Sequence, residues 1–247
     1  SIHTEGSLEP STVGITTTHL TIKGQTMAKL LSISTDALTS SSGSSYINKT
    51  GIYDVVIKFA SVEQSKSGAT QVNFNVDYNG NTQAIYGPYI ASKDGTPISM
   101  GVRFLTELGI ISGLEEGEDL TTEEESFKVG KDNKEKEFTI ITQFSDLEVK
   151  MRLQEEYSSY NGEISKRMVL KAVYRGKDGA SAEEISNNSE VGVKLKKDQA
   201  YASDITYTDC TADEVEEWKK SKAEAAKSPK AEPKAAVKAT GSVFKKQ

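Results

Sequence analysis

Apolar and polar residues alternate most regularly in Gln71-Val72-Asn73-Phe74-Asn75-Val76-Asp77-Tyr78, which continues through Asn79-Gly80 into Asn81-Thr82-Gln83-Ala84-Ile85-Tyr86. A period of two is typical of a β-strand that buries one face, here the face that starts at Val72. Asn-Gly between two such runs favours a two-residue turn, because both residues tolerate positive φ angles. The stretch therefore predicts an antiparallel hairpin in a mainly β protein.

Further strand signals lie on both sides of this hairpin. A long apolar-rich run at 52–62 precedes it and is joined to it by a short turn at 65–68. A second Asn-Gly pair, Asn161-Gly162, predicts another hairpin turn. The other expected strands lie at 138–144, 147–153, 167–175, 191–195 and 201–207.

One helix is expected between the strands. Apolar residues recur at helical spacing from Ile98 to Leu108, with Pro97 near the start and Gly109 near the end. The segment 107–137 then holds eleven acids and four lysines, which is typical of a solvated loop. Five or more antiparallel strands with one inserted helix predict an OB-like antiparallel β-barrel, closed or partly open. A β-sandwich is the alternative fold.

Composition divides the chain into three parts. Residues 1–45 are a polar arm rich in Ser and Thr, 46–208 form the OB-like domain, and 209–247 hold a helix and a flexible tail rich in Lys, Ala and Pro. The helix is expected over 213–222, because acids begin it and lysines end it, which complements the helix dipole. Thr211 is its expected N-cap, and Trp218 is expected to dock it on the domain.

The residue inventory disfavours the common kinds of enzyme. The chain has two histidines, His3 and His19, and one cysteine, Cys210. These residues cannot assemble a His/Cys zinc site, and a serine or cysteine nucleophile would lack a histidine base in the body of the chain. No phosphate-binding or nucleophile-elbow motif is present. We therefore expect no enzymatic activity, no metal and no cofactor, with a carboxylate-based enzyme such as a glycosidase as the weakest alternative.

The cellular compartment follows from two further shortages. A single cysteine forms no intrachain disulfide, which favours a reducing compartment such as the cytoplasm. No apolar run approaches the roughly 18 to 20 residues that a membrane helix needs. We therefore expect a cytoplasmic protein without a membrane partner.

Tyrosines gather on the expected hairpins. A flat phenol ring on a strand or turn can stack on an unpaired base for roughly 1–3 kcal/mol, and nearby Lys or Arg side chains can contact phosphates. The stacking candidates are Tyr78, Tyr86, Tyr89, Tyr157 and Tyr160, and the phosphate candidates are Lys66, Arg152, Lys166 and Arg167. Tyrosine also packs well on a pleated sheet, so ordinary packing is the alternative for each ring.

Charge is unevenly distributed along the chain. The net charge is −6, but residues 219–247 hold nine lysines and two glutamates, a charge of +7, which leaves −13 for the residues before them. An acidic body binds DNA where basic side chains collect in one groove and the acids face elsewhere. The tail, which ends in Gly241-Ser242-Val243-Phe244-Lys245-Lys246-Gln247, is either a solubilising segment or a contact for an acidic partner.

Short motifs also carry a resemblance to a known family. They are Gly51-Ile52-Tyr53-Asp54-Val55-Val56-Ile57, Ser65-Lys66-Ser67-Gly68-Ala69 with the strand at 72–78, and the later segments 154–162 and 177–185. Over roughly residues 50 to 185 the chain resembles the single-stranded-DNA-binding proteins of podophages that package an RNA polymerase in the virion. The resemblance implies an OB-like fold, cooperative coating of single-stranded DNA, and roles in phage replication, recombination and transcription activation in the host cytoplasm.

The same resemblance implies a partner-binding C-terminus. That role would fall on Ser242, Lys245 and Lys246, and Phe244 is the aromatic residue of the same tail. The expected partners are single-stranded DNA, replication or transcription proteins of phage or host that contact the tail, and further copies of the chain along DNA. The alternative function is a structural virion protein, a β-sandwich that clasps its neighbours with residues 1–45.

Overall fold

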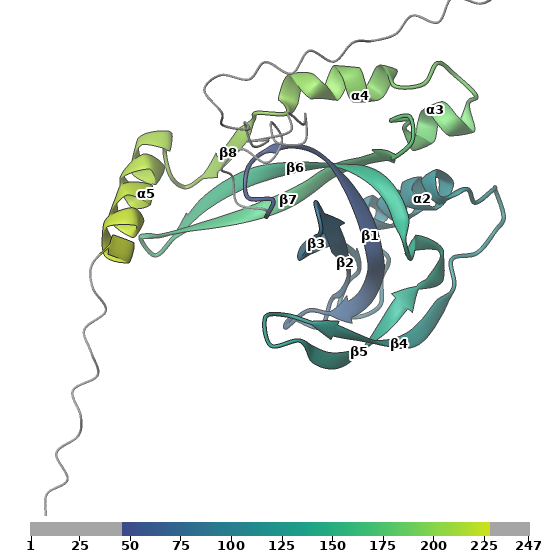
Figure 1. Ribbon diagram of the computed structural model, residues 1–247, viewed down its shortest axis with the longest axis horizontal. Coiled ribbons are helices and arrows are strands. Elements are labelled where there is room, and N and C mark those ends of the chain that lie inside the picture. The colour runs from purple at the N-terminus through teal and green to yellow at the C-terminus, as the bar shows by residue number, and fades with distance from the viewer. Residues whose placement is uncertain (1–45, 228–247) are drawn as a thin grey trace, which may run out of the picture. The chain divides into compact units, whose positions relative to one another are not determined.

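The structure, a computed structural model, describes residues 46–227, which are mainly β (Figure 1). All described strands belong to one eight-stranded sheet. They are β1 (Gly51–Gln64), β2 (Thr70–Tyr78), β3 (Asn81–Ala91), β4 (Thr122–Val129), β5 (Lys134–Ile141), β6 (Leu147–Tyr160), β7 (Glu163–Arg175) and β8 (Ile205–Thr208). The described helices are α2 (Ser99–Ser112), α3 (Ala182–Ser186), α4 (Val193–Asp198) and α5 (Ala212–Lys227), with short 3-10 turns at Thr142–Phe144 and Gln199–Tyr201.

The long strand β1 organises the sheet. Its first half pairs with β6 and its second half pairs with β2. A register shift between Ile57 and Phe59 separates the two halves, and such irregularities bend a strand locally. On its other edge the second half meets β5 at Ser61, so the order is β3-β2-β1-β5-β4. β6 also carries β7 and β8, and β6–β8 is the parallel ladder of this otherwise antiparallel sheet.

The predicted mainly β, antiparallel character is confirmed, whereas closure into a barrel is not observed. β3 and β7 approach each other, but no ladder joins them within the described residues. The eight strands nevertheless share one sheet, which differs from the two separate sheets of the alternative β-sandwich.

The core follows the apolar alternation of the first predicted hairpin. Val72, Phe74 and Val76 are each almost fully buried. They belong to the same buried cluster as Leu108 and Ile111 of α2. α2 contacts β3 and β7, and it extends three residues beyond Gly109, the predicted end.

Both Asn-Gly turns are confirmed. Asn79 and Gly80 have φ angles of 51° and 82°, and Asn161 and Gly162 have φ angles of 50° and 78°. Positive φ at both central residues matches the twist of the strands that such turns connect. The first turn joins β2 to β3, and the second joins β6 to β7.

Three segments correct the sequence prediction. The acidic segment 107–137 is not simply a loop, since it contains the end of α2, all of β4 and the start of β5. The strand predicted at 191–195 is wrong, because Gly192 has a φ of 85° and Val193–Asp198 is helical. The strand predicted at 201–207 is shorter and shifted, to Ile205–Thr208. The helices α3 and α4, between β7 and β8, were not predicted.

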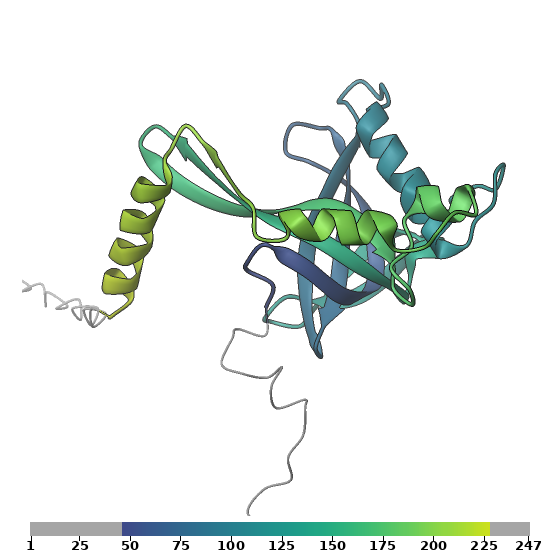
Figure 2. The ribbon, with the colours of Figure 1, turned by 90° about the horizontal axis from the view of Figure 1, so that it is seen from above.

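The predicted C-terminal helix begins with a capping box. Thr211 Oγ1 accepts a hydrogen bond from Glu214 N at 3.3 Å, and the Glu214 carboxylate accepts one from Thr211 N at 2.7 Å. The Trp218 ring lies edge-on to the Tyr157 ring at 6.2 Å, so α5 is docked on β6 as predicted. Figure 2 shows α5 beside the turn that joins β6 to β7.

None of the helices within residues 46–227 has the length and apolar character that crossing a membrane requires. The predictions for the arm at 1–45 and for the tail beyond Lys227 lie outside the described residues.

Candidate nucleic-acid interface

A groove of about 790 Å³ lies between the β1–β2–β3 part of the sheet and the β4–β5 hairpin. We call it the hairpin groove. Its aromatic and basic lining residues are Tyr46, Phe59, Lys66, Tyr86, Lys131, Lys136 and Phe138. Side-chain amides of Gln71, Asn73, Asn75 and Gln83 complete the polar part of the lining. Rings, amines and amides are the groups that an extended nucleic-acid strand requires.

The β4–β5 hairpin forms one wall because its two faces differ chemically. Phe127 lies opposite Lys136 in the ladder, and Phe138 follows on the same face. This face turns toward β1, where Phe59 stacks on Phe127 with 4.0 Å between ring centroids and lies 4.9 Å from Phe138. The opposite face carries Glu124, Glu135 and Glu137. Glu123 and Glu125 share the inner face but do not line the groove.

Two exposed tyrosines stand on the other wall. Tyr86 on β3 is 70% exposed and Tyr46 is 53% exposed. Tyr46 is positioned by its neighbour Ile47, whose backbone N and O each bond the side chain of Gln83 at 2.8 Å. A base can therefore cover the Tyr86 ring without displacing a buried side chain.

The charged lining residues are three lysines and one glutamate, a local charge of +2. Lys136 Nζ lies 3.2 Å from the Glu63 carboxylate and 4.6 Å from the centroid of the Phe138 ring. Lys66 and Lys131 form no ion pair with any residue in 46–227. The groove is thus locally basic in a strongly acidic body, which is the segregation that DNA binding requires.

Glu63 fixes the polar floor of the groove. Burial by itself raises the pKa of this carboxyl, but hydrogen bonds from Asn73 at 2.8 Å and Lys136 at 3.2 Å outweigh it and hold the pKa below its usual value. Glu63 is therefore charged at neutral pH and orients the Asn73 amide. The Asn73 Oδ1 atom is buried without a hydrogen-bond partner among the described residues, so the floor retains one unused acceptor.

The structure brings two of the predicted residues, Lys66 and Tyr86, into this groove. Tyr89 is 44% exposed on β3 but does not line the groove. Tyr160 is 80% exposed and ends β6 at the β6–β7 turn, also outside the groove. The predicted tyrosines therefore do not form one continuous platform.

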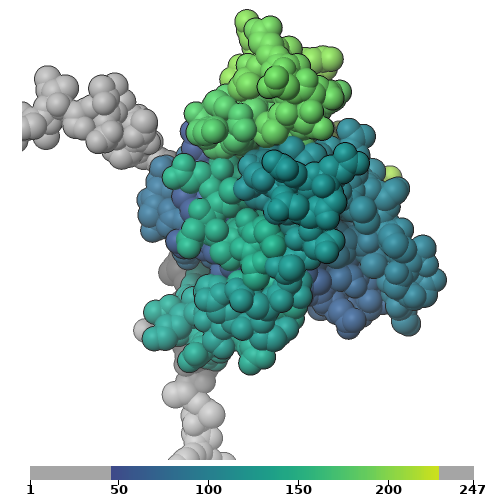
Figure 3. Space-filling model, turned by 90° about the vertical axis from the view of Figure 1, so that its right-hand side faces the viewer, coloured from purple at the N-terminus to yellow at the C-terminus, as the bar shows by residue number. Residues whose placement is uncertain are grey.

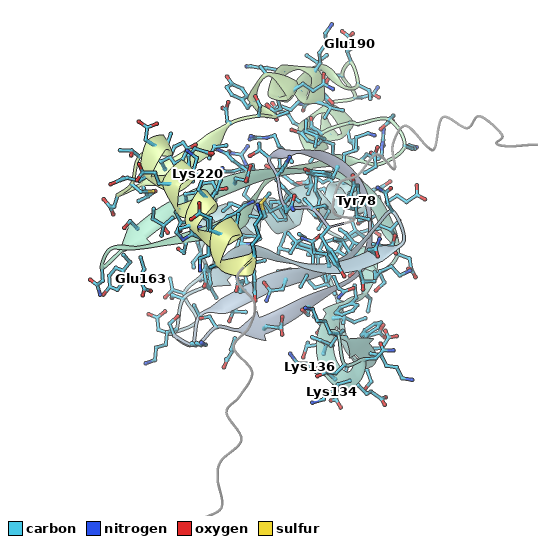
Figure 4. All side chains as sticks on the ribbon, turned by 60° about the vertical axis from the view of Figure 1, so that its left-hand side comes forward. Tyr78, Lys134, Lys136, Glu163, Glu190 and Lys220 are labelled. Atoms are coloured by element: carbon cyan, nitrogen blue, oxygen red, sulfur yellow. The ribbon has the colours of Figure 1, made fainter. Side chains whose placement is uncertain are left out.

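Tyr78 belongs to a different environment. It is half-buried at the end of β2, and its ring lies edge-on to Tyr53 at a centroid distance of 5.3 Å. Figure 4 shows Tyr78 well apart from Lys134 and Lys136 of the β4–β5 hairpin. Its ring serves packing in this conformation.

The prediction of Tyr157 as an exposed stacking ring is wrong, because the residue is only 1% exposed. Its hydroxyl donates a hydrogen bond to Glu155 at 2.9 Å, and its ring stacks on Tyr207 at 5.9 Å. α5 covers it with Trp218 and Lys219, whose Nζ lies 5.1 Å from the ring centroid. β8 and α5, far along the chain, create this burial.

Lys166 and Arg167 on β7 are occupied by carboxylates. Lys166 Nζ lies 2.7 Å from Glu155 and also bonds the carbonyl oxygen of Asn48. Arg167 donates two hydrogen bonds to one oxygen of Glu156, at 3.0 and 2.7 Å. Neither cation lines the hairpin groove, and each would have to leave its acid to hold a phosphate.

Arg152 on β6 is half-buried, and its Nε atom has no hydrogen-bond partner in the described chain. It lies near the Tyr174–Asp198 pair, in which the tyrosine hydroxyl bonds the carboxylate and Lys194 pairs with it. Burial, followed by that bond, raises the pKa of Tyr174. Arg152 is thus part of an internal polar cluster rather than of the groove.

Sequence reasoning missed Tyr46, Lys131, Lys136 and Phe138. A signal was available at the β4–β5 turn, Gly130-Lys131-Asp132-Asn133, in which Gly130 and Asn133 adopt φ angles of 76° and 53°. Phenylalanines flank this turn at 127 and 138, so an apolar face was readable within the acidic run. The tail residues Ser242, Phe244, Lys245 and Lys246 lie outside the described residues.

Neither a metal site nor a similar known protein adds to this description of residues 46–227. No group of three or more His, Cys, Asp and Glu side chains within residues 46–227 is placed to hold a metal ion. The chain matches no protein-family model, no curated protein and no solved structure with which it was compared.

Proposed function

We propose that this protein binds single-stranded DNA in the hairpin groove and catalyses no reaction. The observation that carries the proposal is the joint lining of exposed tyrosines and unpaired lysines, Tyr46, Tyr86, Lys66 and Lys131. Tyrosine rings stack on any unpaired base, and lysines neutralise the phosphates between stacked bases. The amide side chains on the floor are donors and acceptors for base edges.

We further propose that the sheet is an OB-like barrel left open between β3 and β7. The chain order β1–β2–β3–α2 followed by β6–β7, with β6 paired to β1, supports this interpretation. The β4–β5 hairpin is then an insertion after α2. OB-folds bind oligonucleotides on the face of their second and third strands and at the loop between the first two. The hairpin groove includes β2, β3 and the Ser65–Lys66 turn, in agreement with that expectation.

The biological setting belongs to the same proposal. A protein that coats single-stranded DNA would serve phage replication, recombination and transcription activation in the host cytoplasm, as the resemblance implies. Replication or transcription proteins would contact the tail with Ser242, Phe244, Lys245 and Lys246, and further copies would bind along the same strand.

Binding of a labelled twenty-nucleotide oligo-dT, followed by fluorescence anisotropy, tests the proposal. Tyr86→Ala removes a ring of the groove and should weaken binding about 5- to 150-fold, because a stacked base is worth about 1–3 kcal/mol. Tyr160→Ala removes an equally exposed tyrosine outside the groove and should leave the affinity within twofold of the original.

Two outcomes would overturn the proposal. One is the absence of saturable binding by the unmodified protein at micromolar concentrations and low salt. The other is equal weakening by Tyr86→Ala and Tyr160→Ala, which would move binding away from the hairpin groove.

A further inference from the structure

A second groove, of about 1140 Å³, runs along α2. We call it the α2 groove. Its apolar lining comes from α2, from the loop that follows it and from α3, and includes Val102, Leu105, Ile110, Leu114, Leu120 and Ile185. Val102 is 44% exposed, so part of this apolar lining faces solvent. Exposed apolar side chains that line one groove are typical of an interaction site.

The loop that follows α2, residues 113–121, forms one wall of this groove. Gly113 ends α2 in the left-handed conformation at φ 102°, and Leu114 N bonds the carbonyl of Gly109 at 3.0 Å. At the far end, Thr121 N bonds the side chain of Gln143 at 2.9 Å, and Thr142 N bonds the Thr121 carbonyl at 3.0 Å. Both ends of the loop are therefore fixed. Figure 3 shows the face on which this loop lies, below α3 and α4.

Carboxylates border the apolar lining. Glu115, Glu116 and Glu118 line the groove, are exposed, and form no ion pair with any residue from 46 to 227. Arg175, the one cation of the lining, is already paired with Asp178 at 2.7 Å. The rim of the α2 groove therefore holds three negative charges, unpaired within residues 46–227, beside its apolar lining.

We infer that the α2 groove binds the protein's own C-terminal segment, Gly241 to Gln247. That segment sets Val243-Phe244 directly before Lys245-Lys246, so two apolar side chains adjoin two positive charges. In this arrangement Val243 and Phe244 pack on the apolar lining of the α2 groove. Lys245 and Lys246 then pair with the glutamates at its rim. The wider tail strengthens the attraction, because residues 219–247 carry +7.

The chain between α5 and this segment sets how far the segment can extend from the folded part. Phe244 lies seventeen positions after Lys227, where α5 ends, and an extended chain of that length spans up to about 56 Å. Docking covers the tail lysines until a partner displaces the segment. This inference does not depend on DNA binding.

A labelled peptide of residues 234–247 tests the inference without DNA. It is titrated into the full chain carrying Val243→Ser and Phe244→Ser, whose own tail no longer competes. Saturable binding is expected, and adding Glu115→Gln, Glu116→Gln and Glu118→Gln should weaken it at least tenfold. The matched control, Glu124→Gln, Glu135→Gln and Glu137→Gln on the outer hairpin face, changes charge equally and should leave binding unchanged.

A second peptide tests the apolar part of the contact. The same peptide with Val243→Ser and Phe244→Ser should bind at least tenfold more weakly. The inference is overturned by no saturable binding, by equal losses with the two glutamate triples, or by equal binding of the two peptides. Since no DNA is present, none of these results bears on the hairpin groove.

Discussion

Tyr86 and Tyr157 both lie on strands that adjoin hairpin turns, yet Tyr86 is 70% exposed and Tyr157 is 1% exposed. The difference arises outside both hairpins. Tyr157 is covered by β8 and α5, whereas no element within residues 46–227 packs over the Tyr86 ring. The alternation of apolar and polar residues indicates which side chains share a face of a strand. Which face is covered depends on elements that follow later in the chain, here β8 and α5. Of these two tyrosines, both predicted from sequence to stack on bases, Tyr86 is thus open to a base and Tyr157 is buried.

Tyr157→Phe should destabilise the fold without affecting DNA. It removes the hydroxyl that bonds Glu155 at 2.9 Å, and a buried hydrogen bond to a charged acceptor contributes about 1.5–3 kcal/mol. Urea unfolding followed by circular dichroism should show the loss, and Tyr160→Phe at the exposed position should show none. A change in oligo-dT affinity with unchanged stability would contradict this assignment.

Glu155 makes stability sensitive to acid. Burial by itself raises the pKa of this carboxyl, but Lys166, Tyr157 and the Thr50 amide outweigh it, so the pKa lies below the ordinary 4.5. A carboxyl with a lowered pKa in the folded state stabilises the fold above its unfolded-state pKa, and that contribution is lost as pH falls below it.

The urea midpoint should therefore fall between about pH 5 and pH 3, and Glu155→Gln should make this fall shallower. Glu183→Gln, at an exposed residue of α3, is the matched control and should keep the original slope. Identical pH profiles for the original protein and for Glu155→Gln would contradict the prediction.

At the scale of elements, the β4–β5 hairpin is the part that sequence reasoning failed to recognise. Its many glutamates indicate a solvated loop when read alone. The hairpin forms because Phe127 and Phe138 lie on one face and pack against Phe59 of β1, some seventy residues earlier in the chain. By contrast, the two Asn-Gly turns were predictable, because their geometry depends on the two residues themselves.

Phe127→Ala should loosen this hairpin and weaken DNA binding together. Its ring stacks on Phe59 at 4.0 Å, and losing a partly buried aromatic contact costs about 1–3 kcal/mol. Hydrogen exchange of β4 and β5 amides should accelerate, and oligo-dT affinity should fall. Lys128→Ala, the next residue on the opposite face, should alter neither; unchanged exchange in Phe127→Ala would disprove that the ring anchors the hairpin.

Two glycines of α2 should respond oppositely to alanine. A Cβ at Gly101 would lie 1.9 Å from the Tyr89 carbonyl oxygen, so Gly101→Ala forces α2 away from β3. At Gly109 the nearest atoms would be 3.6 and 3.9 Å away, which is ordinary contact. Thermal unfolding should show a severe loss for Gly101→Ala and a gain of up to about 1 kcal/mol for Gly109→Ala from helix propensity. Equal effects would contradict the close approach.

For the molecule as a whole, segregation of charge decides whether an acidic protein can hold DNA. Sequence indicated the excess of acids and the basic tail, but not the collection of Lys66, Lys131 and Lys136 in one groove. These lysines come from the β1–β2 turn and from the β4–β5 hairpin, and only the pairing of β5 with β1 brings the two together. Composition cannot contain that information.

The salt dependence of binding should reflect this small cluster. Two phosphate contacts, from the unpaired Lys66 and Lys131, predict a slope of about −1.4 for the logarithm of affinity against the logarithm of salt concentration. Lys66→Gln with Lys131→Gln should reduce the slope to near zero, while Lys128→Gln on the outer face should not change it. A much steeper slope that persists in the double variant would assign the phosphate contacts to the tail.

Hydrogen exchange of the full protein with and without a saturating twenty-nucleotide oligo-dT shows which surface the DNA covers. Binding in the hairpin groove should slow exchange in residues 64–69, 81–87 and 129–138, which form it, and leave exchange unchanged at 158–165, the β6–β7 turn. Protection of 158–165 with none at the groove, or no protection anywhere, would mean that the hairpin groove does not bind DNA.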